Sequence, residues 1–205
     1  MAKRIITISR EFGSGGRFIG EEVAKKLGIA YYDKNMINQI AEKSGLSPEY
    51  IQENAELSPK KGLFAYAFAG RDITGKSVED IVYEAQRKVI LDIAEKEPCV
   101  IIGRNADYIL KDTEGIRLVR AFIYAPNDVR VHNIMESHNL SEKDAKLLLD
   151  EKDKRYHKRH LALTGSNRGD RHNRDILINS DFLGIQGTAE YLEDLIAKKY
   201  GKKEA

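Results

Sequence analysis

The residues with the clearest chemical meaning are the glycines between Gly13 and Gly16, which separate an apolar run at 5–8 from apolar residues at helical spacing over 19–27. Glycine lets the backbone turn so that successive N–H groups point into one concavity. The N-terminus of a following helix adds a fixed positive dipole end. A strand, a glycine loop and a helix in this order predict a socket for phosphate.

The loop departs from the usual phosphate-loop motif, G-x-x-x-x-G-K-[ST]. Aligned on Gly15, the chain has Arg10 for the first glycine, Gly16 for the lysine and Arg17 for the hydroxyl residue. Arg17 is cationic at all working pH values and begins the helix that faces the phosphates, so we expect it to replace the lysine. The predicted donor-binding residues are Arg10, Gly13, Ser14, Gly15, Gly16 and Arg17.

A basic cluster over residues 152–174 is the second chemical feature. It holds eight Lys or Arg against two Asp, a charge of +6, so the rest of this +2 chain carries −4. Such a cluster indicates a discrete anionic ligand more than a nucleic-acid track. Arg155 and Arg159, one helical turn apart, are predicted catalytic cations that clamp a transferring phosphoryl group. The alternative is a solvated helix face whose arginines pair with Glu151 or Asp153.

Alternating strands and helices must position these groups. Near-continuous apolar strands separated by helices predict an α/β fold, with a parallel sheet of about five strands covered by helices on both faces. We expect strands at 5–8, 30–33, 98–102, 118–124 and 175–179, and helices at 17–27, 34–44, from 47, from 77, and at 128–136, 141–163 and 188–200.

Ligands of such sheets bind beyond the carboxyl ends of the strands. Ser9, Arg10, Asp33 and Arg104 come at or directly after the expected strand ends. The sequence therefore predicts a cleft that combines a phosphate socket, one carboxylate and at least two arginines.

The length of 205 residues predicts a single domain over 1–205. Residues 57–76 show no clean period and are either a mobile flap over a ligand or an irregular packed connection. No apolar run approaches the roughly 20 residues that span a bilayer, and the N-terminus leads into a β-like run, so we expect a cytoplasmic protein without a membrane partner. The lone Cys99 is expected to pack as a small hydrophobe.

Six segments, in order along nearly the whole chain, resemble the cytidylate kinase-like branch of the P-loop nucleoside monophosphate kinases. They are residues 8–17, 31–33, 102–108, 122–126, 153–155 and 178–180. The resemblance implies a helical lid at 141–174, an acceptor-binding segment at 34–76, ATP as donor, Mg²⁺ as bridging ion, and CMP or dCMP as acceptor. By position, Asp33, Arg104 and Asp107 would face the acceptor.

Two alternatives stay open beside a nucleoside monophosphate kinase. One is a nucleotide-binding sensor or partner protein that lost catalysis with its lysine, and the other is a kinase of a non-nucleotide small molecule. We expect a small-molecule nucleotide as ligand, no nucleic-acid partner and no resident metal site, and we allow for a homodimer.

Overall fold

Five parallel strands form one central sheet in the computed structural model, which describes residues 2–33, 35–54 and 77–201. The middle strand is β1, because its Ile5 pairs with Cys99 on one side and Leu118 on the other. The order is β2-β3-β1-β4-β5. The strands are β1 (Lys3–Arg10), β2 (Ala30–Tyr32), β3 (Cys99–Ile102), β4 (Ile116–Tyr124) and β5 (Ile176–Asn179).

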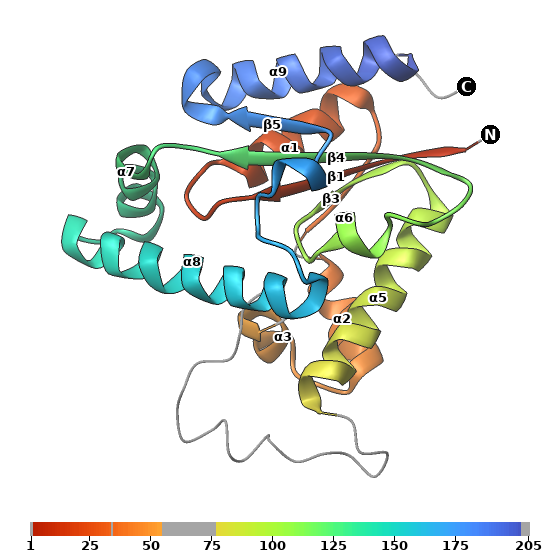
Figure 1. Ribbon diagram of the computed structural model, residues 1–205, viewed down its shortest axis with the longest axis horizontal. Coiled ribbons are helices and arrows are strands. Elements are labelled where there is room, and N and C mark those ends of the chain that lie inside the picture. The colour runs from red at the N-terminus through yellow and green to blue at the C-terminus, as the bar shows by residue number, and fades with distance from the viewer. Residues whose placement is uncertain (1, 34, 55–76, 202–205) are drawn as a thin grey trace.

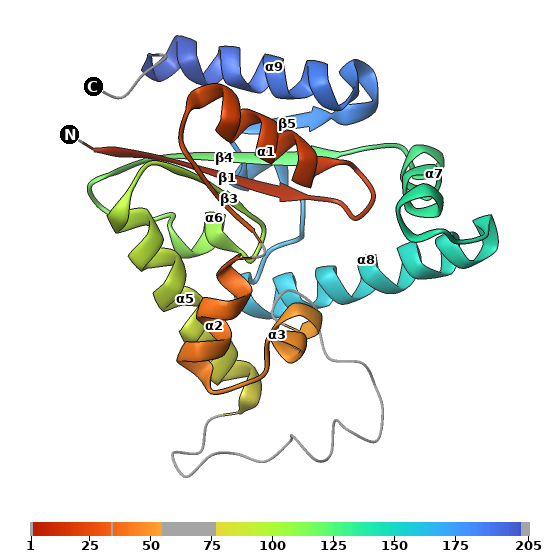
Figure 2. The ribbon, with the colours of Figure 1, turned by 180° about the vertical axis from the view of Figure 1, so that it is seen from behind.

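Helices cover both faces of this sheet, as predicted (Figures 1 and 2). Successive side chains of a strand point to opposite faces. Ile6 and Ile8 therefore pack under α1 (Gly16–Leu27) and α9 (Ser180–Tyr200). Ile5 packs in the opposite core with helices α2 (Asn35–Ser44), α3 (Pro48–Asn54), α5 (Val78–Lys96) and α6 (Ala106–Ile109).

Two further helices form an arm beside the carboxyl ends of the strands. α7 (Asn127–His138) follows β4, and α8 (Glu142–Thr164) packs on it through Val131, Ile134, Ala145 and Leu149. Figure 1 shows α8 running from α7 back below the sheet toward α5. The chain returns through the short helix η1 (Arg171–Asn173) into β5.

Several element boundaries differ from the expectation. Ser9 and Arg10 are the last residues of β1 rather than its successors, since they pair with Phe122 and Ile123 on β4. The expectation that the last helix begins at residue 188 is wrong, because α9 begins at Ser180. The short helix α6 was not predicted, and the irregular segment 57–76 lies outside the described residues.

The cause of the displaced helix start is local. The Asn179 side chain accepts the Asp181 N–H at 3.0 Å and so begins α9, while Gly184 inside it has non-helical angles (φ 67°, ψ 176°). The regular apolar spacing resumes only after this kink.

Other local expectations are confirmed. The helix expected from residue 77 is α5, where Ser77 and Asp80 form a capping box, and Cys99 is fully buried in the core. Across the described part of the chain, no helix is both long and apolar enough to cross a membrane.

Candidate functional site

The connection between β1 and α1 is a tight loop that lies against α7. Gly13 has φ +82°, and a Cβ added there would lie 2.7 Å from the backbone oxygen of Arg130. Gly15, at φ +75°, is the N-cap of α1. Left-handed backbone and the close approach to α7 together require glycine at position 13.

Five consecutive carbonyls of this loop, from residue 10 to residue 14, accept hydrogen bonds from protein groups. The donors are Arg168 for Arg10 O, Ser14 N and Oγ for Glu11 O (3.3 and 2.9 Å), Arg130 Nε for Phe12 O (2.8 Å), Asn133 Nδ2 for Gly13 O (2.8 Å) and Ser180 Oγ for Ser14 O (2.7 Å). In a trans peptide unit the C=O and N–H point in opposite directions. The N–H groups of Phe12, Gly13 and Gly15 therefore face away from the anchoring donors, in the arrangement that suits an anion.

A pocket opens beside this loop, beyond the carboxyl ends of β1 and β3. Its residues come from four parts of the chain: the end of β1, the turn after β3, helix α8 and the connection from α8 to β5. They are Ser9, Arg10, Gly103, Arg104, Asn105, Tyr156, His160, Arg168 and Arg174. Four arginines and no carboxylate line the pocket, so its chemistry suits a ligand with negative charge.

The turn after β3 holds three successive residues in the left-handed region, Gly103, Arg104 and Asn105, at φ 63°, 55° and 52°. Such angles cost energy for residues with a Cβ and persist where the surroundings hold them. Gly103 N donates to Ile8 O at 3.0 Å, and Gln86 Nε2 donates to Arg104 O at 2.7 Å. The turn thus presents Arg104, which is 5% exposed, to the pocket from a fixed backbone.

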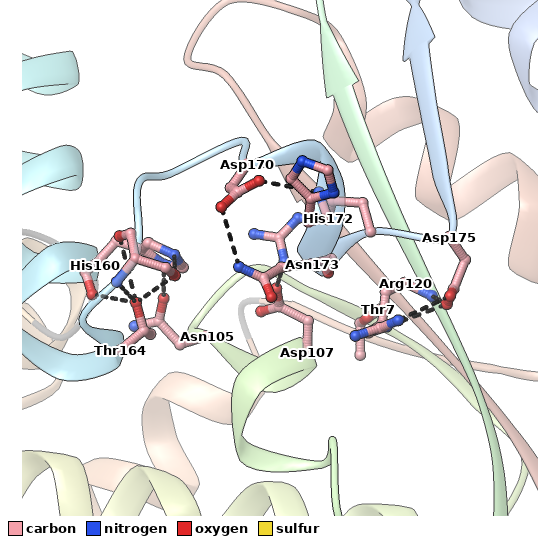
Figure 3. A network of polar contacts seen from close by, with 12 residues as sticks. Thr7, Asn105, Asp107, Arg120, His160, Thr164, Asp170, His172, Asn173 and Asp175 are labelled. Atoms are coloured by element: carbon pink, nitrogen blue, oxygen red, sulfur yellow. Dashed lines mark hydrogen bonds and ion pairs between the residues drawn. The ribbon is translucent and has the colours of Figure 1, made fainter.

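His160 fastens the same turn from α8 (Figure 3). Burial lowers the pKa of its imidazole to about 4, so the ring is neutral at pH 7. Its Nδ1 lies 2.8 Å from Asn105 Oδ1 and its Nε2 lies 3.4 Å from Ser166 Oγ. A proton on Nδ1 fits both contacts, since the amide oxygen accepts and the Ser166 hydroxyl can donate to Nε2. His160 therefore connects α8 to the turn and adds no positive charge to the pocket.

Two residues predicted for opposite sides of the cleft bind each other. Arg17 Nε lies 2.7 Å from Asp33 Oδ2, with the carboxylate buried and the arginine side chain 46% exposed. The nearby Tyr31 hydroxyl donates to Arg17 O at 3.3 Å. Burial raises the pKa of Tyr31, the charge of Asp33 raises it further, and the charges of Arg17 and Arg10 lower it. The geometry gives Arg17 a carboxylate partner and lends no support to its replacing the phosphate lysine.

The two predicted clamp arginines lie on α8 and bind acidic residues. Arg155 Nη1 donates to Glu151 Oε1 at 3.3 Å, one of the partners that the alternative interpretation named. Arg159 is 5% exposed and reaches α5, where its Nη1 donates to Glu79 Oε2 at 2.9 Å. Burial lowers the pKa of Arg159, and the charge of Glu79 opposes that effect. Neither side chain lines the pocket.

Of the residues predicted for the acceptor, Arg104 lines the pocket and Asp107 lies behind it. Asp107 forms a buried ion pair with Arg174, and both side chains are 3% exposed. Asp107 thus orients a pocket arginine. Figure 3 shows it beside the segment that carries Asp170, His172 and Asn173.

Sequence reasoning missed the residues that hold the loop from α7. Arg130 is 3% exposed, donates to Phe12 O at 2.8 Å, and contacts both carboxylate oxygens of Asp153 at 2.8 and 2.7 Å. Asn133 holds the next carbonyl along the loop. Their positions soon after the strand that ends at Tyr124 are the signal that could have found them, because such positions meet the ligand edge of a parallel sheet.

The described residues offer few ligands to a divalent cation. Among residues 2–33, 35–54 and 77–201 no three His, Cys, Asp or Glu side chains gather as metal ligands. Mg²⁺ keeps several waters and, beside nucleotide phosphates, needs only one or two protein oxygens. Ser9 offers such an oxygen in the pocket. These residues fit a Mg²⁺ that arrives bound to a triphosphate.

Comparisons with known proteins agree with this architecture. A family model described as the cytidylate kinase-like family matches residues 5–182. The cytidylate kinase of Pyrococcus horikoshii is 26% identical over 187 residues, which cover 90% of this chain and 84% of that protein. The cytidylate kinase of Thermococcus sibiricus is 25% identical over 202 residues, covering 98% and 92%.

Solved structures show the same fold. An uncharacterized protein from Eubacterium ventriosum is 26% identical, with a TM-score of 0.66 and coverage of 98% of this chain and 100% of that chain. Shikimate kinase from Acinetobacter baumannii, in complex with shikimate, is 15% identical with a TM-score of 0.53 and coverage of 97% and 95%. At this identity the second likeness concerns the fold alone.

Proposed function

The chain belongs to the cytidylate kinase-like family, and from this premise we propose that it transfers the terminal phosphoryl group of Mg²⁺-bound ATP to a nucleoside monophosphate, CMP or dCMP. The observation that carries the proposal is the loop of residues 10–16, anchored through its carbonyls, beside a pocket lined by four arginines. One part suits a polyphosphate donor and the other suits a negatively charged acceptor.

Phosphoryl transfer asks the protein for position and charge more than for covalent chemistry. The loop N–H groups and the start of α1 bind the donor phosphates, and Mg²⁺ arrives with ATP as part of the substrate. The arginines at 104, 168 and 174 hold the phosphate of the acceptor so that one of its oxygens faces the donor. Arginine suits this role because its planar fork binds two phosphate oxygens at once.

The charge of the pocket favours an acceptor that carries a phosphate over a neutral alcohol. A phosphate monoester carries close to two negative charges at pH 7, which the arginines offset. A neutral sugar offers these arginines no negative charge to bind. The relatives named cytidylate kinase support CMP or dCMP as that acceptor.

Helix α8 is the element that we propose as a lid. It carries Tyr156 and His160 of the pocket and, on its other faces, Arg155 and Arg159. Closure of such an element excludes water, which otherwise competes with the acceptor for the phosphoryl group. Arg155 then reaches the transferring group from the lid.

An acceptor panel tests the proposal. The purified protein is incubated with Mg²⁺ and ATP together with CMP, dCMP, UMP, AMP, shikimate or a sugar alcohol, and ADP formation is measured by a coupled assay. ADP formed fastest with CMP or dCMP supports the proposal. ADP formed only with shikimate or the alcohol assigns a small-molecule kinase, and ATP binding without ADP from any acceptor assigns a sensor.

A further inference from the structure

The backbone of Gly16 lies against the side chain of Arg10. A Cβ built on Gly16 would lie 2.6 Å from Arg10 Cβ, 3.2 Å from Arg10 Cγ and 3.3 Å from Ile123 Cβ. The two nearest atoms form the stem of Arg10 close to the backbone, where a side chain has little freedom to move aside. Residue 16 must therefore be glycine as long as residue 10 carries a Cβ in this position.

The usual motif has the reverse arrangement at the same two positions. It places glycine first and lysine seventh, and that lysine reaches the terminal phosphates. In this chain Arg10 stands first and Gly16 seventh. The space that the lysine stem would occupy at residue 16 is filled instead by the arginine stem that starts at residue 10.

Arg10 lies beside the loop that needs a cation. Arg10 lines the arginine pocket beside the loop. The Arg10 backbone is fixed by its place in β1 and by the bond from Arg168 to its carbonyl.

We propose that Arg10 supplies the cation that binds the terminal phosphates of the nucleoside triphosphate, and that Gly16 is the glycine that makes room for it. The cation therefore stands at the first position of the loop motif, residue 10, instead of the seventh, residue 16. This inference rests on the proposed function, because it assumes that the loop binds a triphosphate. It assigns to Arg10 the role that sequence reasoning gave to Arg17.

The test measures binding, so that it does not depend on turnover. Calorimetry gives the dissociation constants of Mg²⁺-ATP and of AMP for the unmodified protein and for Arg10→Ala, Arg10→Gln, Gly16→Lys and the double variant Arg10→Gly with Gly16→Lys. Arg117→Ala is the matched control. Arg117 is an exposed arginine at the opposite end of the sheet, where its backbone on β4 is in register with that of Arg4 on β1. Circular dichroism checks that each variant is folded. If Arg10→Ala does not fold, Arg10→Gln, which keeps the aliphatic stem and removes the charge, takes its place.

We expect the loss of the Arg10 charge to raise the dissociation constant of ATP about ten- to a hundredfold and that of AMP less than about threefold, because only ATP carries the terminal phosphates. Gly16→Lys alone melts at a lower temperature, since two stems compete for one space. The double variant binds ATP more tightly than Arg10→Ala. ATP affinity within twofold of the unmodified protein in both Arg10→Ala and Arg10→Gln overturns the role of Arg10. A double variant no tighter than Arg10→Ala overturns the exchange.

Failure of the proposed function has a different signature. If the unmodified protein binds ATP and forms no ADP with any acceptor, the kinase proposal fails while the binding series still decides the role of Arg10. If the unmodified protein does not bind ATP, both are overturned.

Discussion

The guanidinium of Arg17 and the carboxylate of Asp33 form an ion pair, with Nε and Oδ2 2.7 Å apart. The pair connects the first turn of α1 to the residue that follows β2. A cation that the sequence assigned to the donor and a carboxylate assigned to the acceptor thus act as one unit. That unit lies beside the loop and outside the arginine pocket.

Replacing Arg17 distinguishes a role in donor binding from a role in acceptor binding. We expect Arg17→Ala to leave the KM for ATP within about twofold and to raise the KM for the acceptor several-fold, because Asp33 loses the partner that orients it. The free energy of unfolding falls by about 1–3 kcal/mol, because the Asp33 carboxylate, 7% exposed, loses its cation. Steady-state kinetics with each substrate varied in turn measure both constants. A raised KM for ATP alone would contradict this and support the sequence hypothesis, in which Arg17 binds the donor phosphates.

Arg155 and Arg159 are one turn apart on α8, and we expect the loss of Arg155 to affect turnover and the loss of Arg159 to affect stability. Arg155 is 11% exposed, and its ion pair with the 40% exposed Glu151 at 3.3 Å lies within one helix, where such pairs contribute little to stability. We expect Arg155→Ala to lower kcat by roughly 10²–10³ with a nearly unchanged melting temperature. An unchanged kcat would leave Arg155 with a structural contact on α8 and no part in the reaction.

Arg159→Ala is the matched variant. Its guanidinium is buried and holds Glu79 on α5 at 2.9 Å, so its removal leaves a gap between α8 and α5. We expect the free energy of unfolding to fall by about 1–3 kcal/mol, measured by urea denaturation. A variant as stable as the unmodified protein but slow in turnover would instead place Arg159 on the transferring group.

Arg130 is expected to hold the loop and the arm together. Arg130→Ala removes the donor to Phe12 O and leaves Asp153 without its two shortest bonds. We expect a loss of about 2–4 kcal/mol in the free energy of unfolding, together with weaker ATP binding. Lys198→Ala, which removes an exposed contact with Asp194 on α9, is the control and should leave the unfolding midpoint unchanged. Equal midpoints for the two variants would contradict this role.

The stability of the protein should fall on acidification in a window set by His160. Its pKa is about 4 in the folded protein and near 6.5 when unfolded, so between these values the unfolded state binds the extra proton. The free energy of unfolding therefore decreases as the pH falls from about 6.5 to 4. In His160→Gln, which keeps a donor for Asn105, this slope should be smaller. Urea midpoints at several pH values measure it, and equal slopes would assign the acid sensitivity to other groups.

The fold was accessible from the sequence because its signals are local. The apolar run at 99–102 and the capping residues at Ser77 and Asp80 each predict an element from neighbouring positions alone. The start of α9 was misplaced because Gly184 interrupts the regular spacing inside the helix. Local rules fail where one non-helical residue divides an element.

The site was accessible only in part, because its contacts join distant segments. Arg130 meets Phe12 across 118 positions and Asn133 meets Gly13 across 120, and no spacing in the sequence records such a contact. Arg10 and Arg104 were predicted because both lie where strands end. The exchange between Arg10 and Gly16 is visible only once the separation of their backbones is known.

The central claim is transfer of a phosphoryl group from ATP to a pyrimidine nucleoside monophosphate. Phosphorus NMR of the unmodified protein with Mg²⁺, ATP and CMP follows donor and acceptor in one spectrum. The account predicts that ADP and CDP, with its new diphosphate signals, appear in equal amounts while inorganic phosphate stays at background. ADP accompanied by an equal amount of inorganic phosphate, or a spectrum that does not change, would contradict it.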